Sequence, residues 1–210
     1  MRESFSPKPL QMLEEISRVQ NPNIANILNV YFHEERLIIV SEYLDVSLLD
    51  LQFNRLPPEE WEIATIVSEI INAMAYLLKM FPGFEIHIDS VRLSLQGDVK
   101  LVHDMHYQSS PAEYDPQPQY NSEFLVGILE VLMQYGTSCG RGWSPEAMEF
   151  SLIQASDSLS PFMEHVFLTK SVSSSKLIPR VRLATQILSC QGSSGGIQWL
   201  PDANLQPLHG

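Results

Sequence analysis

Apolar residues in the first fifty positions change from helical to strand spacing along the chain. Residues 10–19 carry an apolar residue at every third position and predict a short amphipathic helix that ends before Asn21-Pro22. Two strand-like runs follow at residues 25–32 and 36–44, and the short polar connector between them predicts a hairpin. The second run is apolar on both faces, which is typical of a central strand or of a strand that is covered on two sides.

The clearest pattern in the chain is an apolar stripe that predicts one long helix over residues 63–78. Its start is expected at Pro57-Pro58-Glu59-Glu60, because proline and acidic residues favour the first helical turn. Two short runs, 91–95 and 99–102, flank Gln96-Gly97-Asp98 and predict a small hairpin. Residues 123–135 are apolar nearly all round and predict a buried helix. Shorter helical stretches are expected near 145–154, 160–169 and 179–189.

The order of these elements predicts an α+β fold, because strands and helices are segregated along the chain rather than alternating. We expect one folded domain at residues 10–190, between an N-terminal tail at 1–9 and a flexible C-terminal tail at 191–210. The tails are polar or rich in Gly, Ser and Pro and carry no periodicity, so they predict no packed structure.

Composition narrows the class of partner. The 210 residues carry a formal net charge of −12, and an acidic surface disfavours nucleic acids and anionic membranes. The two cysteines are far apart, which favours reduced thiols in an intracellular compartment. The N-terminus lacks the apolar core of a signal peptide, and no apolar run was expected to be long enough to cross a bilayer. The sequence therefore predicts a cytoplasmic or nuclear protein.

Four stretches, in chain order, resemble motifs of the eukaryotic protein kinases, and within them the PAK-like Ser/Thr kinases. Residues 21–28 are similar to the HPNIV segment after the regulatory C helix, and residues 38–50 to the strand that enters the hinge and the GSL start of the next helix. VRLSLQGDVKL, at 91–101, looks like the hairpin that follows the catalytic loop, and residues 127–132 resemble the buried F helix. A weaker similarity is Arg182 ahead of Ile187-Leu188.

This resemblance implies a mainly helical C-lobe at 51–190, capped by an N-lobe remnant at 10–50 that holds the C helix and two antiparallel strands. Three residues fall at hinge-like positions of that fold, namely Glu42, Tyr43 and Leu44. The resemblance places a small polar residue, Ser41, at the gatekeeper position.

The parts of a kinase that hold phosphate are missing. Phosphoryl transfer needs a Gly-rich loop and a lysine on the phosphates, and an Asp and an Asn on the metal ions. The loop and the lysine should precede the C helix, where this chain has about nine residues, none of them glycine. Lys8 lies in no strand pattern, and Met12 occupies the position of the C-helix glutamate.

The catalytic loop can be aligned in two ways. Without gaps, Glu85 replaces the base, His87 the loop lysine and Ser90 the metal-binding asparagine. The rival alignment interprets His87-Ile88-Asp89 as a relic of HRD and requires a deletion. Neither alignment restores both the base and the asparagine.

The remaining kinase positions are also altered. His103-Asp104-Met105 stands near the place of DFG, and Asp104 matches the metal-binding Asp only after an insertion. At the F-helix position of the anchoring Asp, the alignment gives Ser122.

Three other interpretations of these residues stay open. A metal site can be imagined from the imidazoles and carboxylate of His87, His103, Asp104 and His106, but their spacing matches no common ligand pattern. Glu85 and Asp89 can be imagined as the paired carboxylates of a hydrolase, or as solvated loop residues. The Ser-, Pro- and Tyr-rich segment at 107–120 is either a docking or phosphorylation segment or a shortened activation loop.

The function that this resemblance and its missing motifs imply is a catalytically inactive, pseudokinase-like domain in signalling, with no cofactor and no metal. Its partner is expected to be a protein, such as an active kinase, or a second copy bound through an exposed strand edge at Ile38, Ile39 and Val40. One alternative is a Ser/Thr kinase family member, or a fragment of one, that retains ATP binding. Another is an unrelated metal-dependent hydrolase.

Overall fold

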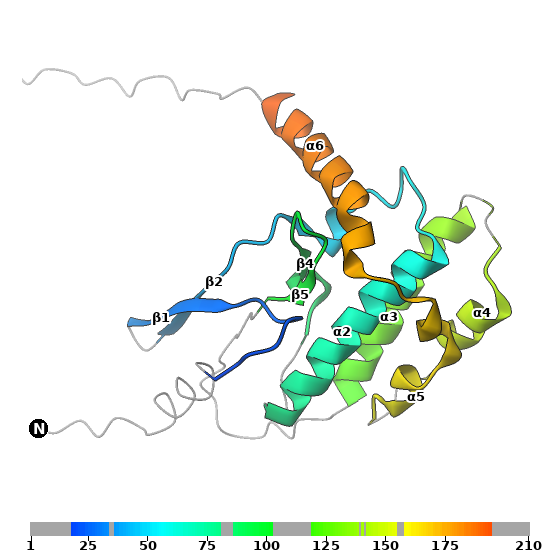
Figure 1. Cartoon of the computed structure of the whole chain (residues 1–210), viewed down its shortest axis with the longest axis horizontal. Coiled ribbons are helices and arrows are strands. Elements are labelled where there is room, and N and C mark those ends of the chain that lie inside the picture. Colours follow the sequence, from blue (N-terminus) through cyan, green and yellow to red (C-terminus); the bar gives the residue numbers. More distant parts are fainter. Residues whose placement is uncertain are drawn as a thin grey trace, which may run out of the picture.

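A computed structural model describes residues 18–33, 36–80, 86–102, 119–138, 140, 142–154 and 158–194 (Figure 1). It contains both helices and two small antiparallel sheets, which agrees with the α+β class. The predicted helix at 10–19 lies almost wholly outside the described residues, as do both of the expected tails except Gln191–Ser194.

The centre of the molecule is α2, Glu60–Met80, and the long predicted helix is confirmed there. Its apolar stripe is buried, with Ile63, Ile66, Val67, Ile70, Met74 and Leu77 all almost inaccessible to solvent. Glu62 caps the start of the helix, because its Oε2 accepts a hydrogen bond of 2.9 Å from the backbone N–H of Glu59. By length and composition α2 would also pass as a membrane span, but 56% of that window is buried inside the protein. The stripe is therefore explained as core.

The other helices lie behind, to the right of and above α2 in the view of Figure 1. The buried helix expected from 123–135 is α3, Gln119–Ser138, which lies beside α2 and buries Leu125, Ile128, Leu129 and Leu132. Past it come α4, Pro145–Ser151, α5, Ser160–Met163, and the 3-10 helices η3, Val166–Lys170, and η4, Ser174–Leu177. The last helix, α6, Ile178–Ser194, continues past the expected end of the domain at 190.

A three-stranded antiparallel sheet lies against one side of α2. The predicted small hairpin is confirmed as β4, Val91–Leu93, and β5, Val99–Leu101. The sequence did not predict β3, Val46–Ser47, which pairs with β4 and is followed by the 3-10 helix η1, Leu48–Asp50. Gly97 makes the β4–β5 turn with φ of 87°, and a Cβ there would lie 2.4 Å from the backbone oxygen of Ser174. The turn is therefore fixed against the segment that leads into α6.

The predicted hairpin of the N-terminal region is present as a separate two-stranded sheet. β1, Ile27–His33, pairs antiparallel with β2, Arg36–Ser41. Both strands are shorter than expected at one end. Ala25 bonds instead to Leu101, its N–H lying 2.8 Å from the Leu101 oxygen, and Glu42 to Leu44 leave the strand. In Figure 1 this hairpin projects from the body on the side away from α4 and α5.

Candidate functional site

The kinase-like catalytic positions are only partly described. His87 and Asp89 are exposed, before and within the 3-10 helix η2, Ile88–Ser90. Ser90 is buried, and its backbone N–H donates to the His87 oxygen at 2.9 Å while its oxygen accepts from Val102 N at 2.7 Å. Glu85, His103, Asp104 and His106 lie outside the described residues, as does most of 107–120. Among the described positions, Ser90 therefore serves the backbone of the turn, and the exposed pair faces solvent.

Two of the hinge-like positions hold the fold together. Glu42 Oε1 accepts from Lys100 Nζ at 2.6 Å and from the backbone N–H of Asn26 at 2.7 Å. Burial raises the pKa of the Glu42 carboxyl, but these two hydrogen bonds and the charge of Lys100 together hold the pKa below its usual value. Leu44 is buried, and its oxygen accepts from Arg92 Nε at 3.3 Å. Tyr43 between them is 81% exposed.

The segment that resembles HPNIV packs between β5 and α2. Ile24 is fully buried and forms a parallel bridge with Leu101, whose N–H donates to the Asn23 oxygen at 2.8 Å. The Asn23 amide donates to the Glu69 carboxylate on α2, and also to the Val99 oxygen at 3.3 Å. These bonds join the chain ahead of β1 to the sheet and to the central helix.

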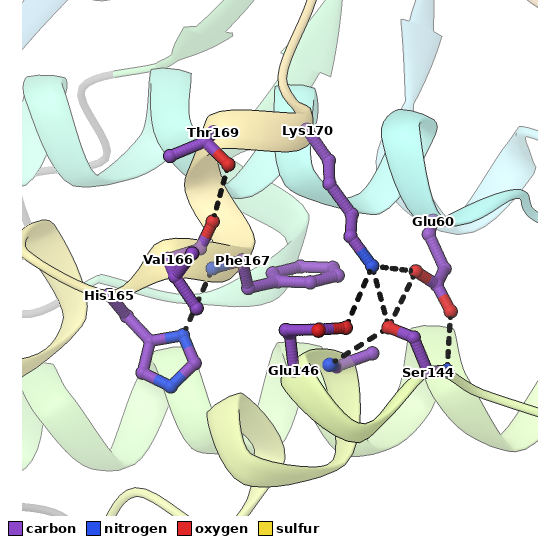
Figure 2. Close-up of polar contacts among 9 residues, drawn as sticks. Glu60, Ser144, Glu146, His165, Val166, Phe167, Thr169 and Lys170 are labelled. Carbon is purple, nitrogen blue, oxygen red and sulfur yellow. Dashed lines mark hydrogen bonds and ion pairs between the residues drawn. The ribbon is translucent and has the colours of Figure 1, made fainter.

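A polar cluster joins α2, α4 and η3 (Figure 2). Lys170 Nζ lies 2.5 Å from Glu60 Oε2, 2.6 Å from Ser144 Oγ and 3.4 Å from Glu146 Oε2. Ser144 donates from Oγ to Glu60 Oε2 at 2.8 Å and from its backbone N–H to Glu60 Oε1 at 2.6 Å. Ser144 also caps α4, since its Oγ accepts from Ala147 N at 3.3 Å.

A serine hydroxyl beside a lysine amine invites comparison with a Ser–Lys nucleophile, but the charges oppose that role. The hydrogen bond to Glu60 raises the pKa of Lys170, helped by the negative charges of Glu60 and Glu146 and opposed by burial. The amine therefore stays protonated and has no lone pair with which to accept the serine proton. His165 does not supply a base either, because its Nδ1 accepts from Phe167 N at 3.1 Å and its ring packs on Phe150. The cluster acts as a charged clamp between elements.

A third charged pair, unlike the pairs of Lys100 and Lys170, is buried in the core, and sequence reasoning missed it. Arg180 on α6 donates from Nε to Glu62 Oε1 at 2.5 Å and from Nη2 to Glu62 Oε2 at 2.7 Å, and both side chains are about 5% exposed. Arg180 Nη1 also donates to the Leu56 oxygen at 2.8 Å. Arg182, the arginine that the resemblance singled out, is exposed. The helical pattern of α6 offers one signal, because position 180 lies on the same side of the helix as the buried Val181 and Ala184.

The β1–β2 hairpin carries an exposed apolar face, so the expectation that its second strand is central or covered on two sides is wrong within the described residues. Tyr31 and Ile38 are directly opposite each other in the ladder and are 52% and 49% exposed, and Val40 on the same face is 40% exposed. We call this the outer face. Val30 and Ile39, opposite each other on the inner face, are half-buried. Among the described residues each of these strands has one neighbour, so each has one open edge.

Within the described ranges, no group of three or more His, Cys, Asp and Glu residues is placed to hold a metal ion. Of the metal site imagined from the sequence, only His87 belongs to those ranges. A scan of the chain against models of known protein families finds no match. The function must therefore be argued from the chain's own motifs and geometry.

Proposed function

We propose that this chain is a catalytically inactive, protein-kinase-like domain that acts as a protein-interaction or regulatory module. Four stretches of the sequence resemble kinase motifs, and some of their residues are among those that the structure describes. The observation that carries it is that the described residues at hinge-like and catalytic-loop-like positions are bonded into the fold or exposed to solvent. Glu42 is bonded to Lys100 and Asn26, Ser90 to the turn that bears it, and Tyr43 lies open.

Two ion pairs of the described part of the chain disfavour nucleotide binding. Triphosphate affinity comes mainly from backbone N–H groups in a glycine-rich loop, from a lysine and from metal ions. Two lysines of the described part are committed to carboxylates: Lys100 to Glu42 and Lys170 to Glu60. A phosphate would have to compete with these ion pairs for the ammonium groups.

Support for an interaction module comes from the hairpin. A two-stranded sheet with no third strand is marginally stable in water, and an open strand edge is a template for pairing with another chain. Here the open edge belongs to a strand with the uncharged run Leu37–Val40, and the outer face beside it is apolar. Such a surface is better suited to protein recognition than to chemistry.

The test is thermal unfolding of the full chain with and without millimolar Mg²⁺ and ATP. A ligand stabilises a folded protein only if the folded state binds it, so we expect an unchanged melting temperature. Mg²⁺ alone serves as the control for salt effects. A rise of several degrees with ATP above that control would overturn the proposal and favour a kinase relative that retains nucleotide binding.

A further inference from the structure

We propose that two copies of the chain pair through the open edge of β2, antiparallel and about a two-fold axis at Ile39. This inference rests on the proposed function, because it names the partner of the interaction module. The alternative occupants of the same edge are a strand from a basic protein or none at all, and the test below separates them. Three features of the hairpin lead to this pairing.

The first feature is that the outer edge of β1 is blocked. The register of β1 shifts between Ile27 and Asn29, which marks a bulge, and bulges spoil an edge for further pairing. The Asn29 side chain then covers the backbone beyond the bulge. Its Oδ1 accepts from Val30 N at 2.9 Å, and its Nδ2 donates to Tyr31 Oη at 2.8 Å. A new strand on this side would have to displace these bonds.

The second feature is the direction of the backbone groups of β2. Glu42 N donates to Asn26 O at 2.8 Å, so the backbone N–H of residue 42 points toward the segment that leads into β1. In an antiparallel ladder, residues whose backbone N–H and C=O point to the neighbouring strand alternate with residues whose groups point away from it. The backbone groups of Val40 and Ile38 therefore point toward β1. Those of Leu37, Ile39 and Ser41 point toward the open edge. The Val30 amide agrees with this assignment, because Val30 lies opposite Ile39 and bonds to Asn29 rather than across the ladder.

The third feature is that these three outward residues are self-complementary. With Ile39 opposite Ile39 of the second copy, Leu37 lies opposite Ser41 of the second copy, and Ser41 opposite Leu37. Every outward N–H and C=O of β2 then meets a partner. A two-fold axis at Ile38 or Val40 pairs fewer of them, because one outward residue falls beyond the end of the other β2.

The side chains support the same register. Ile38 comes to lie opposite Val40 of the second copy, twice by symmetry, so the outer face becomes one apolar surface across four strands.

The size of the pairing and the charge of the chain set the expected strength of the dimer. A pairing of two short strands belongs with the small, weak protein interfaces, so we expect dissociation constants in the micromolar range. Each copy carries a net charge of −12, and the two repel each other over long distances. Salt screens this repulsion and should tighten the dimer. A complex with a basic protein would weaken with salt instead.

The test is sedimentation velocity of the full chain from low to high micromolar concentration, at low and moderate salt. We expect a species of twice the 23.8 kDa monomer mass that grows with concentration and with salt. Ile38→Lys should weaken the dimer by about tenfold or more, because it sets a charge into both of the Ile38–Val40 contacts. Leu152→Lys is the matched control. It makes the same charge change at a leucine that is 74% exposed at the end of α4, and it should leave the dimer unchanged.

A second variant distinguishes loss of the dimer from misfolding of the hairpin. Ile39→Pro removes an N–H that faces away from β1, so the hairpin can keep its own ladder while the two central bonds of the dimer are lost. We expect a monomer with a nearly unchanged melting temperature. In wild-type protein, amide exchange at Leu37, Ile39 and Ser41 should slow as concentration rises.

A wild-type monomer at all concentrations would overturn the pairing, as would equal weakening by Ile38→Lys and Leu152→Lys. A monomer that fails to bind ATP would leave the proposed function standing. Binding of ATP would overturn the proposed function whatever the mass of the protein.

Discussion

At the scale of single residues, the structure depends on polar groups that sequence spacing gives no reason to join. Arg180 and Glu62 are 118 residues apart, yet they form a two-pronged ion pair beneath the start of α2. The Arg180 guanidinium also lies 4.7 Å from the centre of the Phe53 ring. The pair fastens α6 to α2, and each charge is buried only because the other is present.

Removal of one partner of this pair should be costly. Arg180→Met leaves the Glu62 carboxylate buried without a counter-charge, and we expect a loss of about 3–5 kcal/mol in the free energy of unfolding. The double variant Arg180→Met with Glu62→Gln should recover much of it, as measured by urea unfolding. Arg182→Met is the matched control, since this exposed arginine should be replaceable at little cost. Equal losses at both arginines would contradict the account.

Glycines within α3 offer a second test at the same scale. A Cβ on Gly136 would lie 2.2 Å from the Trp143 ring, whose Nε1 is held by a 3.0 Å hydrogen bond to Thr137 Oγ1. At Gly127, by contrast, a Cβ would meet no atom within 4 Å. Gly127→Ala should therefore stabilise the protein by about 0.5–1 kcal/mol, the usual gain from alanine in a helix. Gly136→Ala should destabilise it, and thermal melts of the two variants should move in opposite directions.

At the scale of elements, a charged clamp and an apolar core act together on α2. The apolar stripe of α2 meets the sheet on one side and α3 and η3 on others, while its first turn is held by Lys170 and Ser144 through Glu60. The clamp orients α4 and η3 relative to the central helix. Its energy depends on Glu60 being ionised.

Acid should release this clamp. Burial raises the pKa of Glu60, but hydrogen bonds from Lys170 and Ser144 and the charge of Lys170 outweigh it, so the pKa lies below the usual value. A carboxyl with a depressed folded-state pKa contributes stability above its unfolded pKa, near 4.5, and loses it as pH falls through the folded value. Glu60→Gln should therefore reduce stability at neutral pH and flatten the slope below about pH 4.5. Urea unfolding at several pH values measures this, and parallel profiles for variant and wild type would contradict it.

At the scale of the whole molecule, the helical body and the projecting hairpin have different roles. The body, which consists of the helices and the three-stranded sheet, supplies the core. The hairpin supplies an edge and an apolar face that the described part of the chain does not cover. Under the proposed function, the body presents the hairpin to a partner. The kinase-like stretches then form a scaffold for binding and do not catalyse phosphoryl transfer.

Sequence reasoning succeeded where the signal was local and failed where it was not. The stripe from Ile63 to Leu77 predicted α2, and Gln96-Gly97-Asp98 predicted the β4–β5 turn, because periodicity and turn chemistry act over a few residues. The two-residue strand β3 is too short to carry a pattern. The Lys170–Glu60 clamp joins residues 110 positions apart, and neither residue is unusual in its own segment. Such contacts arise from tertiary packing, which one sequence does not display.

The most direct test of the central claim is an NMR titration of the wild-type chain with Mg²⁺ and ATP, following the backbone amides of Glu42, Tyr43 and Leu44. In a kinase-like fold that binds nucleotide, these hinge-like residues would sense the ligand. We predict that their resonances do not move at millimolar nucleotide, while Mg²⁺ alone serves as the control. A saturable shift at these three amides that the control lacks would contradict the account.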